Sequence, residues 1–145
     1  NLTLKHWDIK GAFLCADIDK TIYLHLPPGY EPAPGYTARL KKSLYGLKQA
    51  SFAFNTLLTG WLRNYGFEPI GGDKVTFKYE KNGSIIILSL YVDDGLAATN
   101  DDQLYQKFLK ALSEEFELSE CGNLEWYLGV AISQNIEQGF TTICQ

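Results

Sequence analysis

The chain has 145 residues, 46% of them hydrophobic and 21% charged, with a formal net charge of −4. This length is typical of a single domain, and a domain of this size can bury a hydrophobic core without stabilising disulfides or metal ions. There is no apolar stretch long enough to span a membrane, no signal segment, and the three cysteines are too widely spaced for a disulfide framework or a CxxC zinc site. We therefore expect an intracellular protein with reduced thiols.

The charge is unevenly distributed along the chain. Residues 1–50 carry seven Lys or Arg against four Asp or Glu, a net +3, whereas residues 101–145 carry two against eight, a net −6. The overall negative charge argues against a wholly basic nucleic-acid binder. A basic first third can face a polyanion, and ordinary solvated faces explain the same distribution equally well.

The first half of the chain predicts two strands, a loop and a helix. Residues 2–9 (LTLKHWDI) predict a strand that reaches Asp8, and the alternation in residues 21–27 (TIYLHLP) predicts a half-buried strand. The proline- and glycine-rich segment 27–35 predicts a loop. Apolar residues from Leu47 to Leu62 then recur at helical spacing, and Gly66 is a stop signal.

The second half predicts a hairpin, a second helix and further strands. Two apolar runs in residues 75–92 flank Asn82-Gly83, which indicates a tight hairpin, and the second run is continuously apolar, as in a strand buried on both faces. A short strand at 95–99, a helix at 100–116 and two closing strands at 124–133 and 139–144 follow. We expect Asn100 or Asp101 to cap this helix. The apolar stripe of the helix is expected to consist of Leu104, Phe108, Leu109, Leu112 and Phe116. The order predicts an α+β fold with two helices on one face of an antiparallel sheet.

Three aspartates lie where expected strands end. Asp93 and Asp94 follow the apolar run IIILSLYV, and Asp8 ends the first strand. A solvated turn is a common reason for an acidic pair at this position. Adjacent strands would nevertheless bring the three carboxylates together, because the entropy of loop closure grows slowly with length. Clustered like charges favour a bound cation, so a metal site is the alternative to a solvated turn.

Four stretches of the sequence, in order, resemble the reverse transcriptase of Ty1/copia-type LTR retrotransposons. They cover nearly the whole chain: DIKGAFLCADIDKTIYLHLPPGY (8–30), RLKKSLYGLKQA (39–50), IIILSLYVDDGLAATN (85–100) and LEWYLGVAIS (124–133). The string YVDD alone would be weak evidence. The resemblance implies a polymerase palm-like domain over residues 1–145, with partial fingers elements at about residues 20–50 and without thumb, connection and RNase H.

The resemblance also implies an activity, RNA-directed DNA polymerisation by two-metal nucleotidyl transfer. The cofactors would be two Mg²⁺ ions, with Mn²⁺ as a substitute, and Mg²⁺ prefers oxygen ligands. Asp8, Asp93 and Asp94 would be the catalytic metal ligands, and the backbone carbonyl of Ile9 a further ligand. The partners would be an RNA or DNA template with its primer and deoxynucleotides, without a membrane, in the cytoplasm (a virus-like particle) or the nucleus.

The same resemblance implies binding roles for further residues. Phe13, Tyr45 and Gly46 would bind the nucleotide, with Phe13 excluding a 2′-hydroxyl. Lys41, Lys42, Lys48 and Gln49 would lie near template or primer. The residues alone leave an alternative for each of these roles. Phe13 can be a core side chain on a short helix, Lys48 and Gln49 can form a polar helix start, and two adjacent lysines are usually a solvated pair.

The sequence departs from the family pattern after residue 50. Ser51, Phe52 and Phe54 stand where the family carries proline, arginine and tryptophan, and losing the arginine removes a bidentate phosphate contact. This leaves two alternatives open. One is a domesticated or truncated palm that does not polymerise and binds protein or RNA, including self-association or a protein partner at exposed strand edges. The other is an unrelated ferredoxin-like binding domain.

Overall fold

The structure is a computed structural model that describes residues 1–30 and 33–145, without the side chains of residues 120 and 121. The chain forms two compact units, one of Asn1–Lys10 with Gly60–Gln145 and one of Gly11–Thr59. The boundary runs through helix α2 (Ala50–Tyr65). Each unit is described by itself below. No helix of the described residues is both long and apolar enough to cross a membrane.

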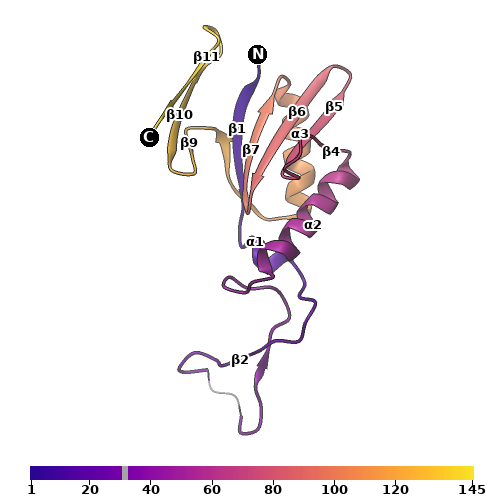
Figure 1. The fold of residues 1–145 in the computed structure, drawn as a ribbon, viewed down its shortest axis with the longest axis vertical. Helices are drawn as coiled ribbons and strands as arrows, with labels where there is room; N and C mark the ends of the chain where they lie inside the picture. Colours follow the sequence, from indigo (N-terminus) through magenta and orange to yellow (C-terminus); the bar gives the residue numbers. More distant parts are fainter. Residues whose placement is uncertain (31–32) are drawn as a thin grey trace. The chain divides into compact units, whose positions relative to one another are not determined.

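The larger unit is built on a six-stranded antiparallel sheet with the order β4-β5-β6-β7-β1-β8 (Figure 1). Its strands are β1 (Thr3–Ile9), β4 (Glu68–Pro69), β5 (Thr76–Lys81), β6 (Ser84–Tyr91), β7 (Asp94–Thr99) and β8 (Leu118–Asn123). The first strand of the chain therefore lies inside the sheet, between β7 and β8. The mixture of this sheet with helices confirms the predicted α+β fold class.

The hairpin of β5 and β6 forms at the predicted dipeptide. Lys81 pairs with Ser84, which leaves Asn82 and Gly83 as a two-residue loop with φ angles of 53° and 82°. Positive φ at both central residues is the requirement of a type I′ turn, and asparagine and glycine meet it with little strain. Local chemistry therefore fixes the register of these two strands.

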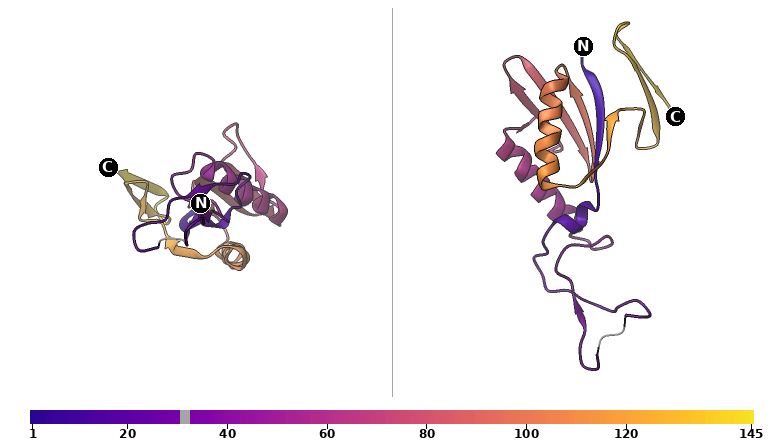
Figure 2. Two further views of the ribbon diagram at one scale, coloured as in Figure 1. Left: turned by 90° about the horizontal axis from the view of Figure 1, so that it is seen from below. Right: turned by 180° about the vertical axis from the view of Figure 1, so that it is seen from behind.

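Two helical segments pack on the same face of the sheet. Helix α3 (Asp102–Glu115) presents Phe108, whose ring centroid lies 6.3 Å from that of Trp7 in β1 and 6.3 Å from that of Trp61 in the last turns of α2. Figure 2 shows α3 lying across this face. Phe108 is fully buried, so it joins both helical segments to the sheet.

The burial of β6 differs from the prediction of a strand buried on both faces. Ile86, Leu88 and Leu90 are buried, whereas Ile85 and Ile87, which alternate with them, are only half-buried. The cause is that both helical segments cover the same face, which leaves the other face of the strand partly open to solvent. This open face carries the candidate site described below.

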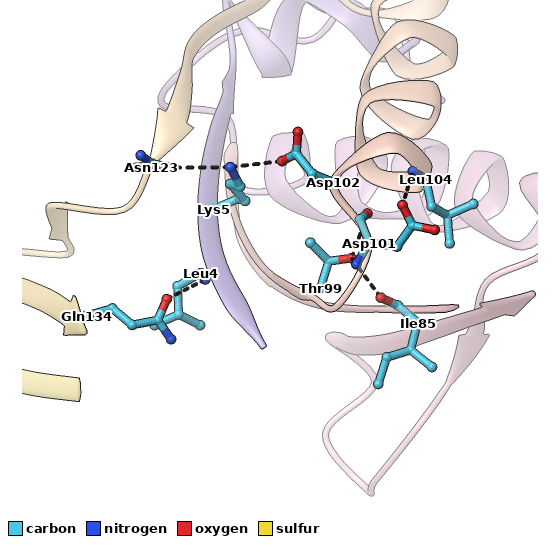
Figure 3. Close-up of polar contacts among 9 residues, drawn as sticks. All are labelled: Leu4, Lys5, Ile85, Thr99, Asp101, Asp102, Leu104, Asn123 and Gln134. Atoms are coloured by element: carbon cyan, nitrogen blue, oxygen red, sulfur yellow. Dashed lines mark hydrogen bonds and ion pairs between the residues drawn. The ribbon is translucent and has the colours of Figure 1, made fainter. Parts of the chain in front are cut away.

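Asp101 caps the N-terminus of helix α3, as predicted. The Asp101 carboxylate accepts a hydrogen bond from the Leu104 backbone N–H at 3.0 Å and from the Ser84 hydroxyl at 2.8 Å. Figure 3 shows the first of these bonds. The predicted apolar stripe needs one correction, because Tyr105 is fully buried and Leu104 only half-buried.

Lys5 ties three elements of the larger unit together. Its Nζ lies 2.9 Å from Asp102 at the start of α3 and 3.0 Å from the side-chain oxygen of Asn123 in β8 (Figure 3). Its side chain is only 15% exposed. A shielded cation needs such oxygen partners, so this position on β1 fixes both the edge strand and the helix.

The chain closes with a separate three-stranded sheet, β9 (Trp126–Tyr127), β10 (Val130–Asn135) and β11 (Phe140–Cys144). The strand expected at 124–133 is broken by a turn, because Leu128 and Gly129 have φ angles of 50° and 80°. Gln134 of β10 attaches this sheet to β1. Its amide accepts from the Leu4 N–H at 2.9 Å and donates to the Leu2 carbonyl at 2.8 Å (Figure 3 shows the bond to Leu4).

The smaller unit contains little regular structure. Its elements are α1 (Ala12–Cys15), β2 (Tyr23–Leu24), β3 (Ala38–Arg39) and the first part of α2. The strand expected at 21–27 is reduced to two residues, which pair with β3. The predicted loop 27–35 is irregular where it is described, and its residues 31–32 lie outside the described residues. Helix α2 starts at Ala50 rather than Leu47, and Gly66, at φ 115°, follows its end as predicted.

Candidate active site

Asp8 and Asp94 lie directly opposite each other in the pairing of β1 with β7. Directly opposed residues of an antiparallel pair have Cβ atoms about 4.5–5.5 Å apart and project from the same face. Their neighbours Trp7 and Gly95 are also directly paired and belong to the buried, helix-covered face. The two half-buried carboxylates therefore share the open face of the sheet, as the sequence led us to expect for neighbouring strands.

A strained two-residue turn carries the third carboxylate. Tyr91 pairs with Asp94, so Val92 and Asp93 form the loop between β6 and β7, and Val92 has a φ of 60°. Positive φ is unfavourable for a β-branched residue. The Asp93 carbonyl accepts a hydrogen bond at 3.1 Å from the N–H of Ile9, the residue after Asp8. This bond holds the strained turn against the end of β1.

The two strand carboxylates each have a hydrogen-bond partner. His6 Nε2 lies 3.2 Å from Asp94 Oδ1, and the Ser119 hydroxyl of β8 donates to Asp8 Oδ2. The Tyr127 ring meets the His6 ring edge-on, with centroids 6.0 Å apart. Burial raises the pKa of Tyr127, and the negative charge of Asp94 raises it further. Neither His6 nor Ser119 is singled out by the sequence alone.

The donor chemistry of this site suits a divalent cation. No group of three His, Cys, Asp or Glu side chains among the described residues is arranged to hold a metal ion. Asp8 and Asp94 still offer hard oxygen donors on one face, and Mg²⁺ in proteins keeps several waters and needs only one or two carboxylates. Opposed like charges in a sheet repel each other, and a divalent cation offsets that repulsion. These residues therefore fit the ion that the resemblance implies.

The expected nucleotide-binding residues lie in the smaller unit, and two of them touch. The Phe13 ring centroid is 4.4 Å from that of Tyr45 and 6.3 Å from that of Phe54. Phe13 is half-buried, whereas Tyr45 is 52% exposed. Gly46 has a φ of 95°, which only glycine adopts readily. Phe13 is thus partly packed against other rings and partly accessible to solvent.

The expected nucleic-acid residues differ in their surroundings. Lys42 pairs with Asp17 at 2.7 Å and reaches the Cys15 carbonyl at 3.3 Å. Lys41 and Lys48 are exposed. Gln49 is half-buried and lines an apolar pocket of the smaller unit together with Ala16, Asp17, Ile18, Asp19, Phe52, Ala53, Thr56 and Leu57. The lysine side chains are accessible, and that of Lys42 is also held by local contacts.

The fold and the open-face carboxylates define the class of protein, an α+β domain with a palm-like sheet. The chain belongs to the reverse transcriptase (RNA-dependent DNA polymerase) family, whose model matches residues 1–145, and within it to the Ty1/copia type. This confirms the family that the four sequence stretches predicted.

The curated relatives are transposon proteins. The chain is 35% identical over 94% of its length to the retrovirus-related Pol polyprotein from transposon RE2 of Arabidopsis thaliana, and 34% identical over 91% to that from transposon TNT 1-94 of Nicotiana tabacum. It is 29% identical over 95% to a transposon Ty5-1 protein of Saccharomyces cerevisiae. It spans 9%, 10% and 46% of these relatives, respectively. No solved structure matches the chain significantly.

Proposed function

We propose that this domain catalyses RNA-directed DNA synthesis by two-metal nucleotidyl transfer. The observation that carries the proposal is the direct pairing of Asp8 with Asp94 beside the Asp93 turn, on the open face of the sheet. In the reaction, the primer 3′-hydroxyl oxygen forms a bond to the α-phosphorus of a deoxynucleotide, and the bond to pyrophosphate breaks. The substrates are a templated primer terminus and deoxynucleoside triphosphates.

Asp8, Asp93, Asp94 and the Ile9 carbonyl would hold the two ions, Mg²⁺ or Mn²⁺. Bound there, the ions would supply Lewis-acid activation of the 3′-hydroxyl and would neutralise the charge of the triphosphate. The hydrogen bond from the Ile9 N–H to the Asp93 carbonyl keeps the turn next to β1. The sheet therefore orients Asp8 and Asp94 and keeps the Asp93 turn beside them.

Residues of the smaller unit would bind the nucleotide and the nucleic acid. The exposed ring of Tyr45, packed on Phe13, offers a flat surface for a base or sugar, and Gly46 allows close backbone approach. Residues 11–59 contain five Lys or Arg against three Asp or Glu. Exposed Lys41 and Lys48 suit phosphate contacts, which supply much of the affinity for nucleic acid.

One observation favours the alternative of a binding module without polymerase activity. Phe52, which replaces the family's arginine, is 77% exposed on α2 and lines the apolar pocket with Leu57, itself 36% exposed. An exposed aromatic beside an apolar hollow suits a protein partner better than a phosphate. The two functions differ in whether the carboxylates are used.

Primer extension on poly(rA) with an oligo(dT) primer separates these functions. With Mg²⁺ or Mn²⁺, the chain should yield product that Asp93→Asn reduces about a thousandfold, because a lost metal ligand removes several kcal/mol of transition-state stabilisation. Asp19→Asn, which changes an exposed carboxylate, should leave the rate unchanged. Absence of product from both this chain and a longer polypeptide extended as in the relatives would refute the enzyme and favour the binding module.

A further inference from the structure

The open-face carboxylates are bound by donors from the chain itself, and those donors come from different strands. His6 lies two residues before Asp8 on β1 and contacts Asp94 across the ladder on β7 at 3.2 Å. Ser119 lies on β8 and donates to Asp8. Each carboxylate therefore has one oxygen engaged by the protein, from the strand next to its own.

A register shift in β8 brings Ser119 to this place. His6 pairs with Gly122 and Asp8 with Ser119, so two steps along β1 correspond to three along β8. In a regular ladder the position opposite Asp8 would be residue 120, which is a glutamate in the sequence. The bulge therefore pairs a hydroxyl donor with Asp8, where regular pairing would place a further acidic residue opposite it. Bulges are a common means of re-aiming side chains beside functional sites.

The direction of both hydrogen bonds follows from the chemistry of the groups. An ionised carboxylate only accepts, so the Ser119 hydroxyl donates to Asp8 and His6 must carry its ring hydrogen on Nε2 to donate to Asp94. The Tyr127 ring packs edge-on against the His6 ring. Such donors fix the orientation of each carboxylate and offset part of the repulsion between them.

We propose that His6 and Ser119 are positioning residues that hold Asp94 and Asp8 in the orientation in which they bind a divalent cation. The inference rests on the proposed function, since it assigns both residues to the carboxylates of that site. Residues that orient metal ligands in this way typically contribute about 10–100-fold to metal affinity. Neither residue needs to contact the nucleotide or the nucleic acid.

Mn²⁺ affinity of the full chain without nucleic acid, measured from the electron paramagnetic resonance of free Mn²⁺, tests the inference independently of activity. His6→Leu and Ser119→Ala should each weaken binding about tenfold. His6→Gln and Ser119→Thr keep a donor and should bind within about threefold of wild type. The matched control is His25→Leu, which removes the other, exposed histidine of the chain and should change nothing.

Asp94→Asn separates failure of the inference from failure of the proposed function. If Asp94→Asn loses Mn²⁺ but His6→Leu and Ser119→Ala bind as wild type, the positioning role is wrong and the metal site stands. If Asp94→Asn binds Mn²⁺ as wild type, the metal site itself is wrong and the inference falls with it. If the leucine or alanine variant does not fold, ¹⁵N NMR of the His6 ring in the wild-type chain tests the positioning role instead. The proposal requires that Nε2 carries the ring hydrogen and that the ¹⁵N chemical shifts of the ring change when Mg²⁺ is added. A ring with its hydrogen on Nδ1, whose ¹⁵N chemical shifts do not change with Mg²⁺, would overturn the proposal.

Discussion

Gly95 is paired with Trp7 in the β1–β7 ladder, and we expect Gly95→Ala to destabilise the larger unit. A Cβ at residue 95 would lie 2.0 Å from Cε2, 2.2 Å from Cζ2 and 2.5 Å from Cδ2 of the Trp7 indole. Carbon atoms pack at about 3.5–4.0 Å, so the ring or a strand must move by about 1.5 Å. The substitution therefore acts as an overpacking probe of this core.

The surroundings of Trp7 determine how large the effect is. The indole is fully buried, and its centroid lies 6.3 Å from that of Phe108, which is itself fully buried. A ring enclosed in this way has no free space to enter, and overpacking of such sites costs about 1–3 kcal/mol. Alanine recovers about 0.5–1 kcal/mol because glycine loses more conformational entropy in a strand. We therefore expect a net loss of up to about 2.5 kcal/mol in the free energy of unfolding.

Urea unfolding followed by far-ultraviolet circular dichroism measures this loss. Gly122→Ala is the matched control, because Gly122 also lies in a strand, β8, and a Cβ there meets nothing within 4 Å. It should be neutral or slightly stabilising. Trp7→Phe in the Gly95→Ala background should cost less than Trp7→Phe alone, because the smaller ring leaves room for the new methyl group. Equal stability of Gly95→Ala and Gly122→Ala would refute the packing argument.

Two further predictions concern the cap of α3 and the attachment of the C-terminal sheet. Hydrogen bonds from the Leu104 N–H and then from the Ser84 hydroxyl hold the pKa of Asp101 below its ordinary value of 3.8, so its contribution to stability is present above that pH and lost as the pH falls below it. Asp101→Asn should therefore flatten the acid side of the stability profile, measured as urea midpoints from pH 7 to pH 3. Gln134→Leu removes the acceptor of the Leu4 N–H, worth about 1 kcal/mol, so hydrogen exchange at Leu4 should accelerate about fivefold. Gln134→Glu keeps this acceptor and loses only the donation to the Leu2 carbonyl, so it should accelerate exchange less than Gln134→Leu does.

The parts of the fold that the sequence predicted are those encoded by neighbouring residues. Asn82 and Gly83 supply the two positive φ angles that a type I′ turn needs. Asp101 caps its helix by accepting a hydrogen bond from the backbone N–H of Leu104, three residues further on. In both cases, the interacting groups lie within one turn of chain. Local propensity and tertiary structure therefore agree, and the expected elements formed.

The missed elements depend on contacts between distant segments. Strand β8 shows no apolar alternation and forms by pairing with β1, more than a hundred residues away. Apolar residues in β6 could not reveal which of its faces the helices cover. The same applies to the site: the pairing of Asp8 with Asp94 followed from the order of strands, whereas the contact of Ser119 with Asp8 depends on the β8 bulge. The catalytic roles themselves stay predictions.

The core and the candidate site are two faces of one ladder, which explains why glycine stands next to Asp94. Trp7 and Gly95 pair on the helix-covered face, and the adjacent pair, Asp8 and Asp94, projects to the open face. Any displacement of β7 that makes room for a Cβ at residue 95 also moves the Asp94 backbone, one residue away, and disturbs its 3.2 Å contact with His6. The absence of a side chain at residue 95 therefore serves the packing of Trp7 and the placement of the carboxylates together.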